Sequence, residues 1–257
     1  MLPREEVVAA IRSASAGGQP ALVGFLTAGF PRKEDFAAHL AAVGAAADVV
    51  EIGVPFSDPM ADGMTIQRSS RSALGQGVSL RWILETLAGL ESRPRAPLLL
   101  MSYLNPLLAY GLERLPAAAR KAGVGGFIVP DLPFEESDEL RAALGAEGLA
   151  LVQMVTPVTP PSRLAVLCSA SEGFVYAVTM TGTTGKSVAV PDGVLAYMDR
   201  VRAVSPVPVC AGFGIRSAEQ VARMAGHVDG VVVGSALVEV LERGEDPAAF
   251  LRALRGT

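Results

Sequence analysis

The stretch ALVGFLTAGFPRKEDFAAHLAAVGAAADVVEIGV (residues 21–54) holds two short apolar runs separated by a segment with helical spacing. ALVGFLT (21–27) and DVVEIGV (48–54) have the length and the β-branched content of buried strands, whereas EDFAAHLAAVGAAA (34–47) spaces its apolar residues as a helix does. Apolar strands that alternate with helices indicate a parallel sheet buried on both faces. The stretch therefore predicts one β-α-β unit.

The same alternation continues along the whole chain. Six further strand-like runs occur at residues 97–103, 126–131, 149–155, 173–179, 206–212 and 228–234. Eight units in 257 residues predict a (β/α)8 TIM barrel that forms a single domain over residues 1–257. A doubly wound open sheet is the alternative, but the glycine-rich first turn typical of that fold is absent after residue 27.

Two segments depart from the regular repeat. Residues 3–15 predict an extra helix ahead of the barrel. The interval at 55–96 is the longest between two predicted strands, and it predicts an insertion after the second strand.

Composition excludes several classes of protein. The net charge is −4 and there is no basic tract, so neither nucleic acid nor an anionic membrane is an expected partner. The N-terminal residues lack the apolar segment of a signal peptide, and the longest apolar-rich stretch, 97–110, is too short to span a bilayer. The two cysteines form no close-spaced motif. We expect a cytoplasmic protein with both cysteines in its core.

The ends of the last three predicted strands are rich in glycine. The first of these ends contains Gly-Lys-Ser at 185–187, but the P-loop pattern requires a glycine where this chain has Met180. Backbone N–H groups on three adjacent loops, one of which opens a helix, form an anion site where such barrels bind phosphate. The sequence therefore predicts a site for the phosphate of a small substrate, formed by TGTTG (181–185), AGFGI (211–215) and VVVGSAL (231–237).

Glu51 is the most informative charged residue in the predicted strands. Strand alternation places it in the barrel interior with Val49 and Gly53. An unpaired carboxylate there is costly, so its pKa should rise. A structural glutamate paired with an interior arginine or with hydroxyls is the alternative, although no predicted strand contains an arginine or a lysine. Asp62 and Asp131 also follow strands, at positions where aspartate is ordinary turn chemistry.

The residues that are absent from the strands narrow the chemistry. No lysine lies in a predicted strand, so a Schiff-base aldolase lacks its amine. His39 and His227 are the only histidines, and both fall in or after helices, so no histidine-ligated metal is expected. Acid–base catalysis by carboxylates remains. The residues alone therefore predict a phosphate-ester lyase or isomerase that uses Glu51, with Asp62 as the second candidate.

The run EIGVPFSDPMADG (51–63) resembles the signature of the tryptophan synthase alpha family. The similarity extends over nearly the whole chain, through FLTAGFP (25–31), MSYLNPLLAYG (101–111), VPDLPFEES (129–137) and the three glycine-rich segments above. The resemblance implies a lyase that cleaves indole-3-glycerol phosphate to indole and glyceraldehyde 3-phosphate in the last steps of L-tryptophan biosynthesis. It also implies a beta-subunit partner in an alpha2-beta2 heterotetramer. The beta subunit would hold pyridoxal phosphate, and this chain would bind no cofactor or metal.

The resemblance assigns roles to individual residues. Glu51 matches the family's acid–base glutamate and Asp62 its second catalytic aspartate. Tyr176 matches the tyrosine beside the indole pocket, and Phe25 and Phe213 match its apolar walls. The remaining matches are the phosphate contacts Gly185, Gly214, Gly234 and Ser235, and Thr184, the mobile-loop threonine that contacts Asp62 when the site closes.

Two positions depart from the family pattern. Met64 stands where the family commonly has proline, and Met180 where it commonly has arginine. Neither removes a catalytic group, but both leave open how strongly the partner activates this chain. Two other functions also stay open: another phosphate-binding TIM-barrel isomerase or lyase, and a non-catalytic subunit that only activates its partner.

Overall fold

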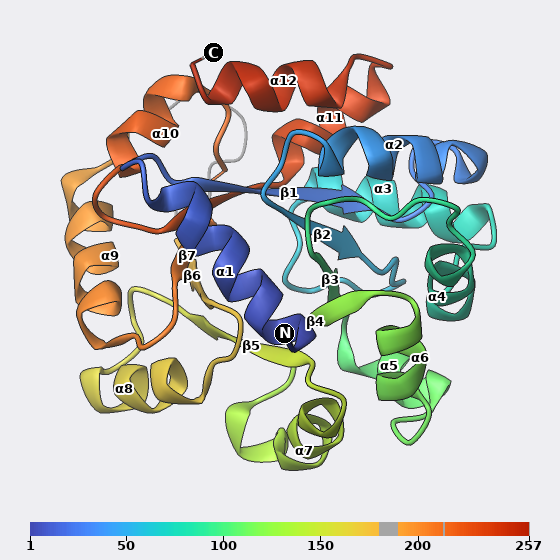
Figure 1. Cartoon of the computed structure of the whole chain (residues 1–257), viewed down its shortest axis with the longest axis horizontal. Coiled ribbons are helices and arrows are strands. Elements are labelled where there is room, and N and C mark those ends of the chain that lie inside the picture. Colours follow the sequence, from blue (N-terminus) through green and yellow to red (C-terminus); the bar gives the residue numbers. More distant parts are fainter. Residues whose placement is uncertain (180–189, 213, 257) are drawn as a thin grey trace.

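Eight parallel strands close into a barrel in the computed structural model, which describes residues 1–179, 190–212 and 214–256 (Figure 1). Each strand pairs with its neighbours in sequence, and β1 also pairs with β8, so the barrel has no open edge. The predicted (β/α)8 barrel is confirmed, and the open sheet is excluded. The strands are β1 (Ala21–Thr27), β2 (Val49–Gly53), β3 (Leu98–Met101), β4 (Val124–Ile128), β5 (Ala150–Val155), β6 (Val175–Val178), β7 (Val209–Gly212) and β8 (Gly230–Val233).

All eight predicted strands are present, but several of their predicted ends are wrong. The run at 206–212 begins as a strand only at Val209, because Pro206 and Pro208 have no N–H to donate to a ladder. In contrast, β4 starts two residues before the predicted 126.

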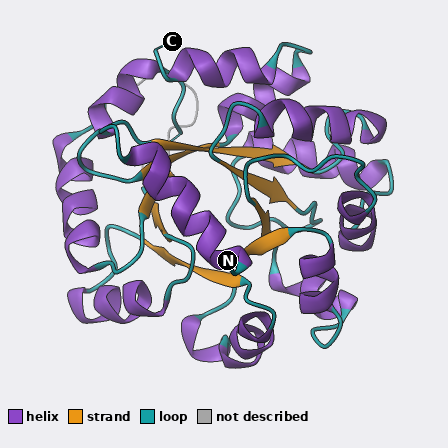
Figure 2. Cartoon of the chain, viewed as in Figure 1, coloured by secondary structure: helices purple, strands orange, loops and turns teal. Residues whose placement is uncertain are grey.

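Helices surround the barrel on its outer face (Figure 2). None of the helices in the described ranges is long and apolar enough to cross a membrane. The α-helices are α1 (Pro3–Ser15), α2 (Phe36–Gly44), α3 (Met64–Gly75), α4 (Leu80–Ala88), α5 (Leu104–Tyr110), α6 (Leu115–Lys121), α7 (Asp138–Ala146), α8 (Pro161–Ala170), α9 (Asp192–Val204), α10 (Ala218–Met224), α11 (Ser235–Glu242) and α12 (Pro247–Leu254). Short 3-10 helices occur at Lys33–Asp35 and Phe134–Glu136.

The extra N-terminal helix is confirmed, and it closes one end of the barrel. In Figure 1, α1 lies across the barrel opening. Its residues Val7 and Ile11 are fully buried and belong to the same apolar cluster as Val49 and Leu99 of the barrel interior. Because α1 covers the N-terminal end, ligands have access from the end where the strands terminate.

The insertion after β2 is also confirmed. The chain from 55 to 63 leads to α3, and a second helix, α4, follows before β3 begins. Polar side chains join α3 to α11: Thr65 donates to Glu239, and Arg68 donates to both carboxylate oxygens of Glu242 at 2.9 and 2.7 Å. Helix α3, which follows the loop after β2, is therefore held against the helix that follows β8.

Candidate active site

Glu51 lies inside the barrel with no exposed surface. Its register neighbours are Phe25 on β1 and Leu99 on β3. Neither carboxylate oxygen has a hydrogen-bond partner among the described residues. Burial raises the pKa of Glu51 to about 8, and the charge of Asp62 contributes to this rise. Glu51 therefore holds a proton at neutral pH and can act as an acid.

Asp62 lies in the loop between β2 and α3, and its neighbours hold it in place. Burial raises its pKa to about 6, while a hydrogen bond from Tyr103 opposes this rise. The Tyr103 hydroxyl also accepts the N–H of Ala61 at 2.9 Å, and its ring stacks on Phe56 with centroids 5.2 Å apart. The amide of Gln67 donates to the Asp62 carbonyl at 2.8 Å. Asp62 is thus largely ionised at pH 7, where Glu51 is not.

A cavity of about 610 Å³ opens at the C-terminal ends of the strands. Its volume lies within the range of ordinary small-molecule sites. Seven of the ten residues proposed from the sequence line it, whereas Thr184, Gly185 and Phe213 lie outside the described residues. The seven are Phe25, Glu51, Asp62, Tyr176, Gly214, Gly234 and Ser235.

Two aromatic rings form walls of the cavity beside Glu51. The ring of Phe25 lies over Gly53 so closely that a Cβ there would stand 2.5 Å from its Cζ. Tyr176 covers Gly212 in the same way, at 2.7 Å from its Cε1. Glycines on the adjacent strands therefore make room for the rings. Burial, and then the charge of Glu51, raises the pKa of Tyr176 well above its usual value, so its hydroxyl keeps its proton.

The cavity lining at the ends of β7 and β8 offers backbone N–H groups. Gly214 has a φ of 73°, a conformation that glycine adopts without strain. Gly234 precedes α11, and its carbonyl accepts the N–H groups of Leu237 and Val238 at 2.9 and 3.1 Å. The N–H groups of the first helical turn have no acceptor within the helix and carry the positive end of its dipole. This side of the cavity is suited to an anion.

The structure assigns positions near the site to two residues that the sequence analysis missed, and a structural contact to a third. Tyr103 and Arg216 are not among the residues proposed from the sequence, although each follows the end of a strand, β3 and β7 respectively. A survey of the residues just after every strand would have found both. Asp131, by contrast, accepts the N–H of Leu104 at 2.9 Å at the start of α5, a structural contact with a distant segment rather than the local turn role considered for it.

Together, the barrel, the two carboxyl groups with separated pKa values and the exposed N–H groups at the strand ends form an arrangement typical of (β/α)8-barrel enzymes. The family model described as "Tryptophan synthase alpha chain" matches residues 11–254. The chain belongs to the tryptophan synthase alpha chain family, which comprises lyases of tryptophan biosynthesis. This membership confirms the resemblance seen around residues 51–63.

Individual relatives agree over almost their full length. The chain is 47% identical over 247 residues to the tryptophan synthase alpha chain of Solidesulfovibrio magneticus, covering 96% of each protein. It is 46% identical over 244 residues to that of Nitratidesulfovibrio vulgaris strain DP4, covering 95% of each. Among solved structures, a Mycobacterium tuberculosis tryptophan synthase chain is similar with a TM-score of 0.89 at 36% identity, with 97% of this chain and 96% of that one covered.

Proposed function

We propose that this chain performs its family's reaction, the cleavage of indole-3-glycerol phosphate to indole and glyceraldehyde 3-phosphate, with Glu51 and Asp62 as its catalytic residues. The observation that supports this assignment best is the pair of carboxyl groups in one cavity. Glu51 is buried without a partner in the described part of the chain, with a pKa of about 8, and Asp62 has a pKa of about 6. One group is therefore an acid at the pH at which the other is a base.

The reaction needs a proton at C3 of indole before the C–C bond can break. Glu51 donates that proton, and the ring nitrogen becomes positively charged. Asp62, as the carboxylate, accepts the indole N–H and stabilises this charge. The ionised Glu51 then removes the proton from the hydroxyl on the carbon bonded to C3. The C–C bond breaks, its electron pair returns to the indole ring, the aldehyde forms, and Glu51 is protonated again.

The rest of the cavity would bind the two ends of the substrate. Phe25 and Tyr176 provide flat apolar surfaces for the indole, and we assign Phe213 to the same wall. The phosphate would lie against the backbone of Gly214, Gly234 and Ser235, with Gly185 as a further contact. Thr184 would contact Asp62 when the sixth-strand loop closes over the substrate.

The direct test is indole release by the isolated chain from indole-3-glycerol phosphate. Release that is lost when the phosphate is removed from the substrate would support both the reaction and the anion site. A chain that binds ribulose phosphate but not indole-3-propanol phosphate would instead be a sugar-phosphate isomerase on the same scaffold. The aromatic walls argue against that alternative, since a sugar phosphate offers no flat apolar group.

The family name also implies a beta-subunit partner. We propose an alpha2-beta2 heterotetramer in the cytoplasm, with pyridoxal phosphate bound by the beta subunit alone. Met60 and Met64 are 83% and 74% exposed on the segment that bears Asp62, so they offer apolar surface to a partner close to the site. Size-exclusion chromatography of a mixture with the beta subunit tests the assembly. Separate elution of the two proteins at micromolar concentration would contradict it.

We expect kcat/KM to be highest between about pH 6 and about pH 8. Activity requires Asp62 without its proton and Glu51 with its proton, and burial raises their pKa values to about 6 and about 8. The rate should therefore fall below the first value and above the second. A rate that keeps rising to pH 10 would show that Glu51 is not the acid.

We expect Gly234→Asp to raise KM at least about 10-fold, because a carboxylate would stand beside the phosphate and repel it. Gly234→Ala is the matched control, since among the described residues a Cβ at this position meets only the Cβ of Phe25, at 4.0 Å. The alanine variant should keep KM within about threefold of wild type. An unchanged KM in the aspartate variant would place the phosphate elsewhere.

A further inference from the structure

Arg216 lies in the wall of the cavity, two residues after Gly214. Among the described residues that line the cavity, it is the one with a basic side chain, whereas Glu51 and Asp62 are acidic. Gly214, Gly234 and Ser235, which together form the proposed phosphate end, line the same cavity. Positive and negative side chains therefore occupy different strand ends of one site.

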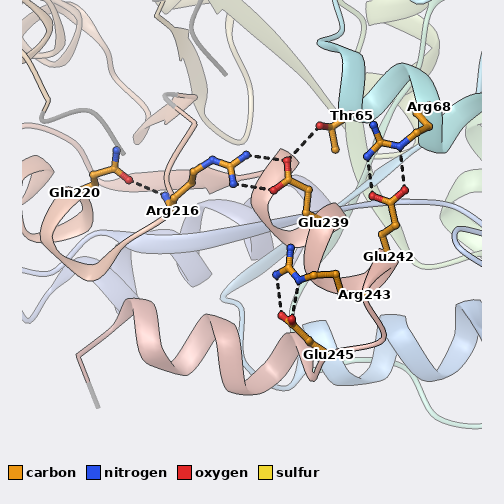
Figure 3. Close-up of polar contacts among 8 residues, drawn as sticks. All are labelled: Thr65, Arg68, Arg216, Gln220, Glu239, Glu242, Arg243 and Glu245. Atoms are coloured by element: carbon orange, nitrogen blue, oxygen red, sulfur yellow. Dashed lines mark hydrogen bonds and ion pairs between the residues drawn. The ribbon is translucent and has the colours of Figure 1, made fainter. Parts of the chain in front are cut away.

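The guanidinium of Arg216 is fixed by other elements of the barrel (Figure 3). Its Nη1 and Nη2 donate to Oε2 and Oε1 of Glu239 on α11, each at 2.8 Å. Thr65 of α3 donates to the same Oε1 at 3.3 Å. The backbone N–H of Arg216 donates to Oε1 of Gln220 at 2.7 Å. Both the backbone and the side chain of Arg216 are thus positioned before any ligand binds.

The chemistry of the ligand calls for such a group. A phosphate ester carries close to two negative charges at neutral pH, and backbone N–H groups offset these only with partial charges. A guanidinium has five N–H donors, of which Glu239 accepts two, and within the described part of the chain the other three are available to a second acceptor. The Arg216 side chain is 28% exposed, so the solvent screens its charge only in part.

We propose that Arg216 binds the phosphate of the substrate and selects phosphorylated over unphosphorylated ligands. This inference rests on the proposed phosphate end at Gly214, Gly234 and Ser235. Glu239 of α11, the helix that Gly234 and Ser235 open, holds the guanidinium in the wall of the cavity that these two residues also line. The carboxyl groups of Glu51 and Asp62 lie on β2 and in the loop after it, away from β7 and β8, so the charge distribution also orients the substrate with its indole toward them.

The test compares two ligands that differ only in the phosphate: indole-3-propanol phosphate and indole-3-propanol. In Arg216→Gln we expect the dissociation constant of the phosphorylated ligand to rise about 10- to 100-fold, as expected for loss of hydrogen bonds to a charged group. The affinity for the unphosphorylated ligand should stay within about twofold, because the indole contacts do not change. Arg216→Lys keeps the charge and should recover part of the loss.

Arg68→Gln is the matched control. Arg68 also pairs through two hydrogen bonds with a glutamate of α11, Glu242, but it does not line the cavity. Loss of Arg68 should leave both affinities within about twofold of wild type. This variant also shows how far an unpaired glutamate on α11 affects binding by itself. Melting temperatures of both variants show whether either effect comes from unfolding.

Two different results would overturn two different claims. If wild type prefers the phosphorylated ligand and Arg216→Gln keeps that preference, Arg216 is only a link between α11 and the loop after β7. A lysine variant no better than the glutamine variant would contradict the role of the charge. If wild type itself shows no preference, the proposed phosphate end is wrong, whatever Arg216 does.

Discussion

Glu51→Gln is expected to lower turnover of indole-3-glycerol phosphate by at least about 10³-fold. A single proton transfer by a positioned group contributes about 10²–10⁴-fold, and in the proposed mechanism Glu51 transfers both the proton given to C3 and the proton taken from the hydroxyl. Glutamine has nearly the same shape but can neither donate an acidic proton nor accept one. Affinity for indole-3-propanol phosphate should persist, because the ring and phosphate contacts are unchanged.

The stability of this variant provides its control. In wild type the pKa of Glu51 is raised from 4.5 to about 8, so the folded protein keeps a proton that the unfolded chain releases. As pH rises from 4.5 to about 8, ionisation therefore favours the unfolded state. Glutamine does not ionise, so the melting temperature of the variant relative to wild type should rise as pH increases from 4.5 to about 8. A folded variant with near-wild-type turnover would remove Glu51 from the mechanism.

The barrel and the interior position of Glu51 can be predicted from the sequence because both follow from local patterns. Alternation along a strand determines which side chains point inward, and it places Glu51 on the same side of β2 as Val49. The placement of Gly214 and Gly234 in one cavity is predictable because each follows a strand, and strand ends meet at one face of a barrel.

Contacts between distant segments cannot be predicted in the same way. Thr65 and Glu239 are 174 residues apart, and their pairing depends on how α3 packs against α11. The hydrogen bond from Tyr103 to Asp62 likewise depends on the path of the loop after β2. Predicted strand ends are wrong where prolines interrupt an apolar run, as before Val209. Local patterns therefore predict which groups are present in the site, and packing determines how they are held.

Asp62→Asn is expected to lower kcat about 10²–10³-fold with little change in KM, comparable to the loss of one preorganised electrostatic contact to a transition state. Asparagine keeps an oxygen for the indole N–H and for the Tyr103 hydroxyl, so the binding geometry should survive. The negative charge is lost, and it is needed only once C3 has been protonated and the ring is positive. Steady-state kinetics separates the two effects. A large rise in KM with kcat unchanged would show that Asp62 only binds the substrate.

The pH dependence of this variant tests the coupling between the two carboxyl groups. Below about pH 6, the slope of log kcat/KM against pH should decrease by one, because the variant no longer has the ionisation of Asp62. Above neutral pH the limb due to Glu51 should move to lower pH, since the charge of Asp62 contributes to its raised pKa. Burial is the larger cause, so this pKa should still stay above 4.5. An alkaline limb that does not move would mean that Glu51 does not sense the charge of Asp62, and the two groups would then act independently during the reaction.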